Sequence, residues 1–191
     1  MKKATIVLGS PNIRGNTARL ADAMISGMES NNIVIKKYEL FKLKQVNHCT
    51  GCNSCKKNDA HKCIFDDGLN DIISEVRDSE LLVIASPIYF FNFNSLTKAF
   101  IDRLFYSSEI DNDNNLLKGK NVAVLITYGL DNVMESGAKN ALQSFYDISK
   151  FVGLKIAGIV YGSIGDNDKE NDIVLHKARS LGELVGANIV A

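Results

Sequence analysis

The chain has 191 residues, of which 46% are hydrophobic and 23% charged, and its 22 basic side chains balance its 22 acidic ones. This length and charge predict one globular domain over residues 1–191 and give no electrostatic reason to expect nucleic acid or an anionic membrane as a partner. No apolar run approaches the ~20 residues that cross a bilayer, so we expect no membrane-spanning segment.

Five short apolar runs rich in Val, Ile and Leu predict β-strands. They cover residues 4–8, 33–40, 81–85, 122–127 and 156–161. Lys36 and Lys37 interrupt the second run and predict an edge strand, whereas the other four lack strict alternation and are typical of strands covered on both faces. The first run is too short for a signal peptide and is broken at Pro11, so we expect a strand there and a reducing cytoplasm as the location.

Apolar side chains recur at helical spacing between these runs and predict five helices. The stripes cover residues 17–28, 69–76, 96–104, 138–152 and 174–185. We expect Asn16 to cap the first helix, and Asp66 and Asp67 to cap the second. Asp102 and Arg103 are expected to form an ion pair on the third. The alternation predicts an α/β fold with a doubly wound parallel sheet, in which ligands bind beyond the carboxyl ends of the strands.

The loop after the first strand is rich in small and hydroxyl residues. Residues 9–17 read Gly-Ser-Pro-Asn-Ile-Arg-Gly-Asn-Thr and lead into the first predicted helix. A helix N-terminus carries unpaired N–H groups and about half a positive charge, so the loop predicts a phosphate site to which Ser10, Asn16 and Thr17 add donors. Its glycine spacing matches neither a P-loop nor the dinucleotide fingerprint. A polar turn that only caps the helix is the alternative.

The loop after the third strand, residues 86–94, is crowded with aromatic side chains. Such a loop at a strand end suits a flat ligand ring that stacks on Tyr89 or Phe90 and accepts hydrogen bonds from backbone amides. The alternative for Phe91 and Phe93 is packing under the third helix or against a second subunit.

All four cysteines of the chain lie within residues 49–63, inside a cysteine-rich loop at about 41–67. The spacing C-x2-C-x2-C-x7-C is typical of the loops that hold an iron–sulfur cluster. Structural zinc favours two separated C-x2-C pairs and fits less well, while free or redox thiols remain the second alternative. The four candidate metal ligands are Cys49, Cys52, Cys55 and Cys63.

Histidines and lysines surround these cysteines. We expect His48 and His61 to be solvated loop residues and His176 to lie on the surface of the last helix. The five nearby lysines either attract an acidic electron-transfer partner or simply face solvent; they are Lys42, Lys44, Lys56, Lys57 and Lys62.

Taken together, residues 9–17, 49–67, 86–90 and 98–103 resemble the flavodoxin-like NAD(P)H-dependent FMN reductase family, particularly its iron–sulfur flavoprotein branch. The resemblance implies a five-stranded sheet of order 2-1-3-4-5, non-covalent FMN, and a homodimer or homotetramer. The FMN phosphate would lie on Ser10, Asn12, Gly15, Asn16 and Thr17. The flavin ring would lie on Pro87, Ile88, Tyr89, Phe90 and Asn92, flanked by Thr127, Tyr128 and Gly129. The cysteines would hold a [4Fe–4S] cluster.

The expected function is therefore an FMN-dependent oxidoreductase or electron-transfer flavoprotein, with NAD(P)H or reduced ferredoxin as donor and the cluster as a one-electron relay. Because flavin supplies the chemistry, we predict no catalytic acid or base. The alternatives are a cluster-free NAD(P)H-dependent FMN/quinone reductase, a non-catalytic electron carrier like flavodoxin, and a zinc-organised interaction module. The expected partners are small-molecule or protein electron donors and acceptors.

Overall fold

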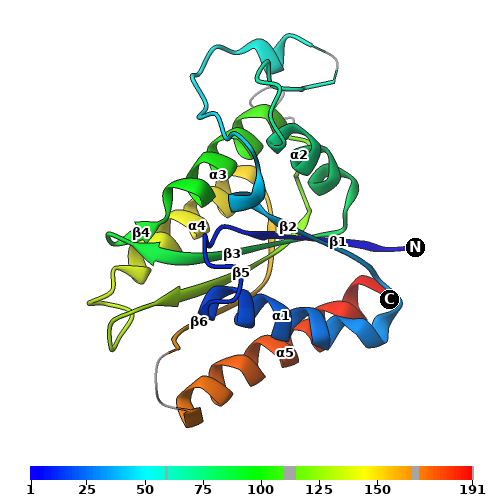
Figure 1. The fold of residues 1–191 in the computed structure, drawn as a ribbon. Helices are drawn as coiled ribbons and strands as arrows, with labels where there is room; N and C mark the ends of the chain where they lie inside the picture. The colour runs from blue at the N-terminus through cyan, green and yellow to red at the C-terminus, as the bar shows by residue number, and fades with distance from the viewer. Residues whose placement is uncertain (59, 110–114, 165–167, 191) are drawn as a thin grey trace.

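The computed structural model describes residues 1–58, 60–109, 115–164 and 168–190, and strands and helices alternate along it (Figure 1). Residue 59, within the predicted cysteine loop, lies outside the described residues. The strands are β1 (Lys3–Leu8), β2 (Val34–Glu39), β3 (Leu81–Tyr89), β4 (Asn92–Phe93), β5 (Asn121–Tyr128) and β6 (Lys155–Ser163). The helices are α1 (Asn16–Met28), α2 (Leu69–Asp78), α3 (Ser95–Ser108), α4 (Ala138–Val152) and α5 (Asp168–Val190).

The main strands run parallel in the order β2-β1-β3-β5-β6, and the short β4 folds back on β3 as an antiparallel hairpin. This confirms the predicted order, with the hairpin as an addition. The central strands β1, β3 and β5 are almost wholly buried, whereas β2 is half-exposed, as an edge strand should be. The last strand is also covered on both faces, as predicted, because Ile159 packs against one core and Val160 lies in the other. β6 is the second edge of the sheet, and Ile156 and Tyr161 are partly exposed.

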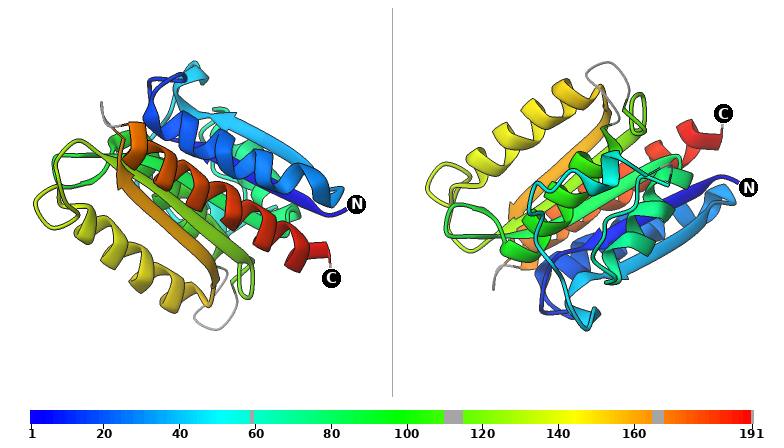
Figure 2. Two further views of the ribbon diagram at one scale, coloured as in Figure 1. Left: turned by 90° about the horizontal axis from the view of Figure 1, so that it is seen from below. Right: turned by 90° about the horizontal axis from the view of Figure 1, so that it is seen from above.

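Two apolar cores lie on opposite faces of the sheet. Helices α1 and α5 lie side by side on one face, and α2, α3 and α4 cover the other (Figures 1 and 2). Every central strand contributes side chains to both cores, which is why its sequence is apolar without alternation. The loops at the carboxyl ends of β1, β3 and β5 are thereby held at one end of a rigid sheet.

Strand β3 continues through Pro87, which we had expected to follow the strand. Its register explains the exception, because β1 pairs with β3 only as far as Ala85, whereas β5 pairs with Pro87 through Thr127. Past Ala85 one side of β3 has no neighbouring main strand that needs an N–H donor, so the missing N–H of proline costs no ladder bond there. The extension carries Ile88 and Tyr89 out beyond the end of the sheet.

Two of the expected helix caps differ from the prediction. Helix α1 has Gly15 at its N-cap position with no side-chain capping bond, and Asn16 is instead its first helical residue. At α2 the cap position is Gly68; Asp67 accepts from the N–H of Leu69 at 3.2 Å, while Asp66 is exposed. Within the part of the chain that the structure describes, no side chain caps the backbone N–H groups in the first turn of α1.

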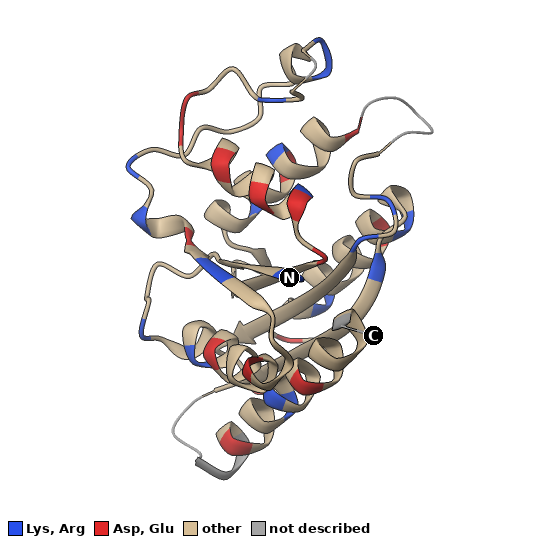
Figure 3. Ribbon diagram, turned by 90° about the vertical axis from the view of Figure 1, so that its right-hand side faces the viewer, with Lys and Arg blue, Asp and Glu red and all other residues tan. Residues whose placement is uncertain are grey.

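Basic and acidic residues are interspersed over the helices and loops in the view of Figure 3. Among the described residues, no helix combines the length and the apolar character that crossing a bilayer requires.

Candidate functional site

A cleft of about 350 Å³ opens at the carboxyl ends of β1, β3 and β5. It brings together three loops that are far apart in the sequence, as expected for a doubly wound sheet. Apart from Ile164, which follows β6, every described residue that lines it belongs to the predicted cofactor site. These residues are Ser10, Asn12, Gly15, Asn16, Thr17, Pro87, Ile88, Tyr89, Thr127, Tyr128 and Gly129.

A second cavity of about 270 Å³ adjoins this cleft and shares Ile88, Tyr128 and Gly129 with it. Its other lining residues are Phe90, Phe91, Leu130 and Ser136. Of the predicted cofactor residues, Asn92 alone lines neither space; its Oδ1 accepts a hydrogen bond from the N–H of Phe93 at 2.8 Å. The cleft is polar at the end near α1, and the adjoining cavity is apolar.

Hydroxyl groups line the inner wall of the cleft. Oγ1 of Thr17 on α1 lies 2.6 Å from Oγ1 of Thr127 on β5, and both side chains are buried. Ser10 Oγ accepts from the N–H of Asn12 at 3.2 Å. Together with the uncapped first turn of α1, these groups offer hydrogen-bond donors and a positive dipole end to an anion. Arg14 is exposed, so the charge that it adds is a solvated one.

Asn94 joins the first and third loops. Its Nδ2 donates to the carbonyl of Gly9 at 2.7 Å, and its Oδ1 caps α3 by accepting from the N–H of Thr97 at 3.0 Å. Gly9 and the first turn of α3 lie so close together that a Cβ on Gly9 would be 1.8 Å from Oγ1 of Thr97. Sequence reasoning missed this residue, although an Asn placed directly before a helical stripe is a recognisable cap signal.

Tyr128 stands where the cleft and the cavity meet. Burial, and to a smaller extent repulsion from Tyr161, raises the pKa of its phenol. The group therefore keeps its proton and can donate a hydrogen bond to a ligand in either space.

The aromatic residues after β3 divide between surface and core. Tyr89, Phe90 and Phe91 are exposed by 50%, 99% and 55%, whereas Phe93 is 6% exposed and packs in the core beneath α3. Packing under the third helix therefore holds for Phe93 but not for Phe91.

The cysteine loop lies over α2 and α3, at the top of Figure 1, and the four cysteines line neither of the strand-end spaces. Cys55 is buried, Cys49 and Cys63 are half-buried, and Cys52 is exposed. Burial is the main cause that raises the pKa of the Cys55 thiol, and charge on Cys63, Cys49 and Cys52 raises it further. The other three thiols therefore lie close enough to Cys55 to act on it electrostatically. Among the described residues, no group of three or more His, Cys, Asp or Glu side chains is placed to hold a single metal ion.

The stem of this loop is fixed by Arg103, whose partner differs from the predicted one. Arg103 of α3 pairs with Asp67 through two buried side chains, while Asp102 pairs with Lys98 at the surface. Adjacent residues of a helix point in different directions, so Asp102 and Arg103 do not face each other. Asp67 also accepts from the N–H of Asn47 at 2.9 Å, which ties the start of the loop to its end.

Asn70 and Arg77 of α2 hold the backbone next to the cysteines. Asn70 accepts from the N–H of Cys63 at 3.2 Å and donates to its carbonyl at 3.1 Å. Arg77 donates to the carbonyls of Ala60 and His61 at 3.3 and 3.1 Å. Burial lowers the pKa of Arg77, with a partial offset from the thiol of Cys55. The sequence analysis identified neither residue, because a polar side chain on an amphipathic helix gives no local sign that it bonds to a distant loop.

Of the residues around the cysteines, His61 and Lys56 are less exposed than expected. His61 is half-buried, with Nδ1 3.3 Å from the carbonyl oxygen of Cys55, while His48 and His176 are exposed as predicted. Lys56 pairs with Glu109 at 2.9 Å and lies over the ring of Tyr106 at 4.6 Å. Lys42 pairs with Glu39, and Lys44, Lys57 and Lys62 face solvent.

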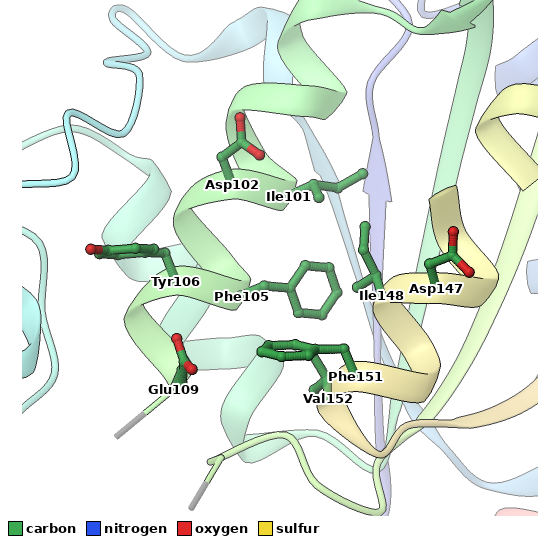
Figure 4. Close-up of a pocket in the computed structure, with 9 residues that line it drawn as sticks. All are labelled: Ile101, Asp102, Phe105, Tyr106, Glu109, Asp147, Ile148, Phe151 and Val152. Carbon is green, nitrogen blue, oxygen red and sulfur yellow. The ribbon is translucent and has the colours of Figure 1, made fainter. Parts of the chain in front are cut away.

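A further hollow, of about 410 Å³, lies between α3 and α4 (Figure 4). The rings of Phe105 and Phe151 face each other in it, and the carboxylates of Asp102, Glu109 and Asp147 lie at its margin. Its floor is apolar and it lies away from the strand ends, so it does not suit a phosphate-bearing cofactor.

The strand order and the strand-end cleft define a flavodoxin-like protein. The family model described as Flavodoxin-like fold matches residues 2–184. The iron-sulfur flavoprotein of Archaeoglobus fulgidus is 30% identical over 186 residues, which are 96% of this chain and 78% of that protein. The chain therefore belongs to the flavodoxin-like family, in the branch of the iron-sulfur flavoproteins.

Two further relatives extend the comparison. YwqN of Bacillus subtilis, provisionally named an NAD(P)H-dependent FMN-containing oxidoreductase, is 26% identical over 93% of both chains. Among solved structures, NAD(P)H:quinone oxidoreductase from Methanothermobacter marburgensis superposes with a TM-score of 0.72 over 95% of this chain and 98% of that one, at 12% identity. At that identity the superposition shows the shared fold alone.

Proposed function

We propose that this protein is an FMN-dependent oxidoreductase that moves electrons from NAD(P)H, or from a protein donor of the ferredoxin type, to a small-molecule acceptor. One observation carries the proposal: the polar cleft at the ends of β1, β3 and β5 opens into an apolar cavity of similar size. A flavin nucleotide has the same division, with an anionic phosphate at one end and a flat ring at the other. The names of the relatives support the same class of enzyme.

The donor set of the polar end fits the phosphate. It combines the buried hydroxyls of Ser10 and Thr17 with the uncapped N-terminus of α1. We assign the phosphate to these groups together with Asn12, Gly15 and Asn16.

The ring end is assigned to the extension of β3 and the end of β5. Pro87, Ile88, Tyr89, Phe90 and Asn92 would hold one edge of the ring, and Thr127, Tyr128 and Gly129 the other. Apolar side chains there exclude water, and the protonated Tyr128 offers a hydrogen bond. Bound FMN would supply the exchange between two-electron and one-electron transfer. With NAD(P)H as donor, one NAD(P)H and one proton are consumed, NAD(P)⁺ leaves, and the acceptor gains two electrons and two protons.

We further propose that the cysteine loop holds a [4Fe–4S] cluster on Cys49, Cys52, Cys55 and Cys63. The spacing of the four cysteines and the names of the iron-sulfur flavoprotein relatives support this assignment. The cluster would supply a one-electron relay. A cluster-free reductase is the second candidate, favoured by the similarity of the whole chain to YwqN.

Anaerobic purification followed by quantification of FMN, iron and acid-labile sulfide tests both proposals. We expect stoichiometric FMN, about four irons per chain, and oxidation of NAD(P)H with ferricyanide as acceptor. FMN without iron would reject the cluster and leave the reductase. A protein that takes up no FMN on reconstitution would reject the proposed function, and one that holds FMN but does not oxidise NAD(P)H would be a carrier or depend on a protein donor.

We propose that the protein is a homodimer or homotetramer of the cytoplasm. Phe151 and Tyr146 of α4 are exposed by 78% and 50% beside the hollow between α3 and α4, which supports an apolar contact with a second copy. The four free thiols suit a reducing compartment. Light scattering during size-exclusion chromatography tests the assembly, and a single monomer peak at all concentrations would reject it.

A further inference from the structure

A series of buried polar contacts connects the loop after β1 with the end of β3. Nδ2 of Asn94 donates to the carbonyl of Gly9 at 2.7 Å, and Oδ1 of Asn94 lies 2.6 Å from Oγ1 of Thr97. The same Oγ1 lies 2.9 Å from Oγ of Ser86, which in turn lies 2.9 Å from the carbonyl oxygen of Pro87. The contacts thus run without a gap from the polar end of the cleft to its ring end. We call Ser86, Asn94 and Thr97 the buried network.

The buried network does not touch the space that a ligand would occupy. Ser86, Asn94 and Thr97 are exposed by 0%, 3% and 1%. Neither they nor Gly9 line the cleft or the adjoining cavity. A fully paired set of buried polar groups makes its surroundings rigid and specifies one arrangement of them. An effect of the network on a bound molecule must therefore pass through the positions of the two loops.

The contact between Gly9 and Thr97 fixes the same distance by shape. A Cβ on Gly9 would lie 1.8 Å from Oγ1 and 3.1 Å from Cβ of Thr97. The φ of Gly9 is not positive, so the close approach and not the backbone conformation requires glycine here. The loop after β1 is thereby seated on the first turn of α3, the helix that directly follows the β3–β4 hairpin (Figure 1).

The two ends of the cleft differ in what else holds them. The ring end is fixed by the sheet, because Pro87 pairs with Thr127 of β5 and the next two residues of β3 pair with β4. Residues 9–15 belong to no strand or helix. Gly9 holds them to β3 through its N–H, which donates to the carbonyl of Ala85 at 2.8 Å, and to α3 through its own carbonyl. Loss of the network should therefore shift the polar end and leave the ring end in place.

A ligand that must reach two subsites at once gains affinity from both only when their spacing matches its own length. A spacing that is already formed also spares the cost of ordering loops on binding. FMN has this requirement, whereas riboflavin, which lacks only the terminal phosphate, needs the ring end alone. The ratio of the two affinities therefore reports on the spacing between the ends.

We propose that the buried network of Ser86, Asn94 and Thr97 sets the spacing between the phosphate and ring subsites and thereby determines the selectivity for FMN over riboflavin. The three are positioning residues, because they act through the loops and not on the ligand. The inference rests on the proposed function, since it takes the phosphate and the ring to lie at the two ends assigned to them there.

The test is Thr97→Val, which keeps nearly the same shape and removes the hydroxyl that faces Asn94 and Ser86. Thr97→Ser is the conservative variant and keeps that hydroxyl. Gly9→Ala is an independent variant, which removes no polar group but pushes the loop away from Thr97. Thr5→Val is the matched control for the loss of a threonine hydroxyl, because Thr5 is equally buried on β1 and lies outside the cleft.

The dissociation constants of FMN and of riboflavin are measured for each protein after removal of bound flavin, by the quenching of flavin fluorescence. Tm is measured on the same samples, and the titrations are made well below the lowest Tm. A variant that is less stable but still folded keeps the wild-type ratio of the two constants. A changed spacing alters that ratio.

We expect Thr97→Val and Gly9→Ala to bind FMN at least about tenfold more weakly, because the phosphate no longer reaches its subsite while the ring is bound. Both should bind riboflavin within about threefold of the wild type. Thr97→Ser and Thr5→Val should bind both flavins within about threefold of the wild type.

An unchanged FMN affinity in Thr97→Val would overturn the inference, and if that variant does not fold, Gly9→Ala decides in the same way. An equal loss of both flavins would also overturn it, as would a Thr97→Ser variant that loses FMN like Thr97→Val. Wild-type protein that oxidises NAD(P)H but binds both flavins equally would reject the inference and leave the proposed function intact. Wild-type protein without FMN affinity would refute both.

Discussion

Arg103 of α3 and Asp67, at the end of the cysteine loop, form an ion pair that is shielded from solvent. Nη1 of Arg103 lies 2.5 Å from Oδ2 of Asp67, and the side chains are 1% and 0% exposed. The pair joins the cysteine loop to the helix that follows the β3–β4 hairpin. A buried charge that loses its partner is far more costly than an exposed one, so this pair should contribute strongly to stability.

The first prediction concerns the loss of this pair. Asp67→Asn leaves the Arg103 guanidinium buried without its counter-charge and should lower the free energy of unfolding by about 3–5 kcal/mol. The matched control is Asp102→Asn, which breaks the exposed pair with Lys98 on the same helix and should cost less than about 1 kcal/mol. Urea denaturation followed by circular dichroism measures both. Two variants of equal stability would contradict the importance of the buried pair.

The same carboxylate predicts a pH dependence. Burial alone would raise the pKa of Asp67, but hydrogen bonds from Asn47 and Arg103 outweigh it, and the pKa lies below its ordinary value. Because the folded pKa is the lower one, the stabilisation is fully present above the unfolded value of about 3.9 and is lost as the pH falls through the folded pKa. The wild type should therefore keep its advantage over Asp67→Asn at neutral pH and lose it progressively below about pH 4. Denaturation at several pH values checks this, and a loss that is already complete near pH 6 would be inconsistent with it.

Much of the fold could be predicted because buried parallel strands leave a strong local signal. The runs at 81–85 and 122–127 are apolar without alternation, and both proved to be central strands. The local sequence pattern could not show whether a strand has a hydrogen-bonded neighbour on both sides. The run at 156–161 reads like a central strand, but among the described residues no strand other than β5 pairs with β6. Pro87 reads like a strand end, but the missing neighbour on one side lets β3 continue.

The candidate cleft could be anticipated because three strand-end loops must converge in this topology, and the structure brings Ser10, Tyr89 and Thr127 to one space. The side chains that hold the loops in place could not be predicted, because their partners are distant in the sequence. Arg103 reaches Asp67 across 36 positions, and Asn94 reaches Gly9 across 85. Neither separation leaves a periodic signal, so the pairing of Arg103 with its neighbour Asp102 was the wrong choice.

The buried hydroxyl pair of the cleft predicts a selective effect on cofactor affinity. Thr17→Val or Thr127→Val removes one of two hydroxyls that lie 2.6 Å apart at the polar end. Each should weaken FMN binding about tenfold, which corresponds to about 1.4 kcal/mol. Thr5→Val is the matched control, since Thr5 is equally buried on β1 but lies outside the cleft. Titration of flavin fluorescence gives the dissociation constants, and equal affinities for all three variants would remove Thr17 and Thr127 from the cofactor site.

The bonds of Asn70 predict an effect on the proposed cluster. Asn70→Asp keeps an acceptor for the N–H of Cys63 and for Arg103 but loses both donations, to the carbonyls of Cys63 and Phe65. Less iron should be retained per chain after anaerobic reconstitution, and Asn70→Ala should retain least. FMN per chain is the internal control, because Asn70 lies outside the cleft. Iron retention equal to that of the wild type in both variants would show that Asn70 does not position Cys63.

The contact between Gly137 and Phe91 leads to a prediction about the position of the β3–β4 hairpin. Its φ is +73°, and a Cβ there would overlap both Cα and Cβ of Phe91. Gly137→Ala should therefore lower the free energy of unfolding by about 1–2 kcal/mol through backbone strain alone, and more because the hairpin must move. Phe90 and Phe91 line the apolar cavity proposed for the flavin ring, so their displacement should also weaken FMN binding several-fold.

Gly153→Ala separates these two effects, because Gly153 ends α4 with a similar φ of +76° and its Cβ would approach only Cγ of Lys118, at 3.2 Å. It should show the strain of a left-handed alanine without moving the hairpin. Denaturation measures the shared cost, and titration with FMN measures the effect specific to Gly137. If both variants bind FMN like the wild type, the cofactor site does not depend on the contact between Gly137 and Phe91. If both lose FMN affinity equally, the loss comes from general destabilisation, because of these two glycines only Gly137 contacts Phe91.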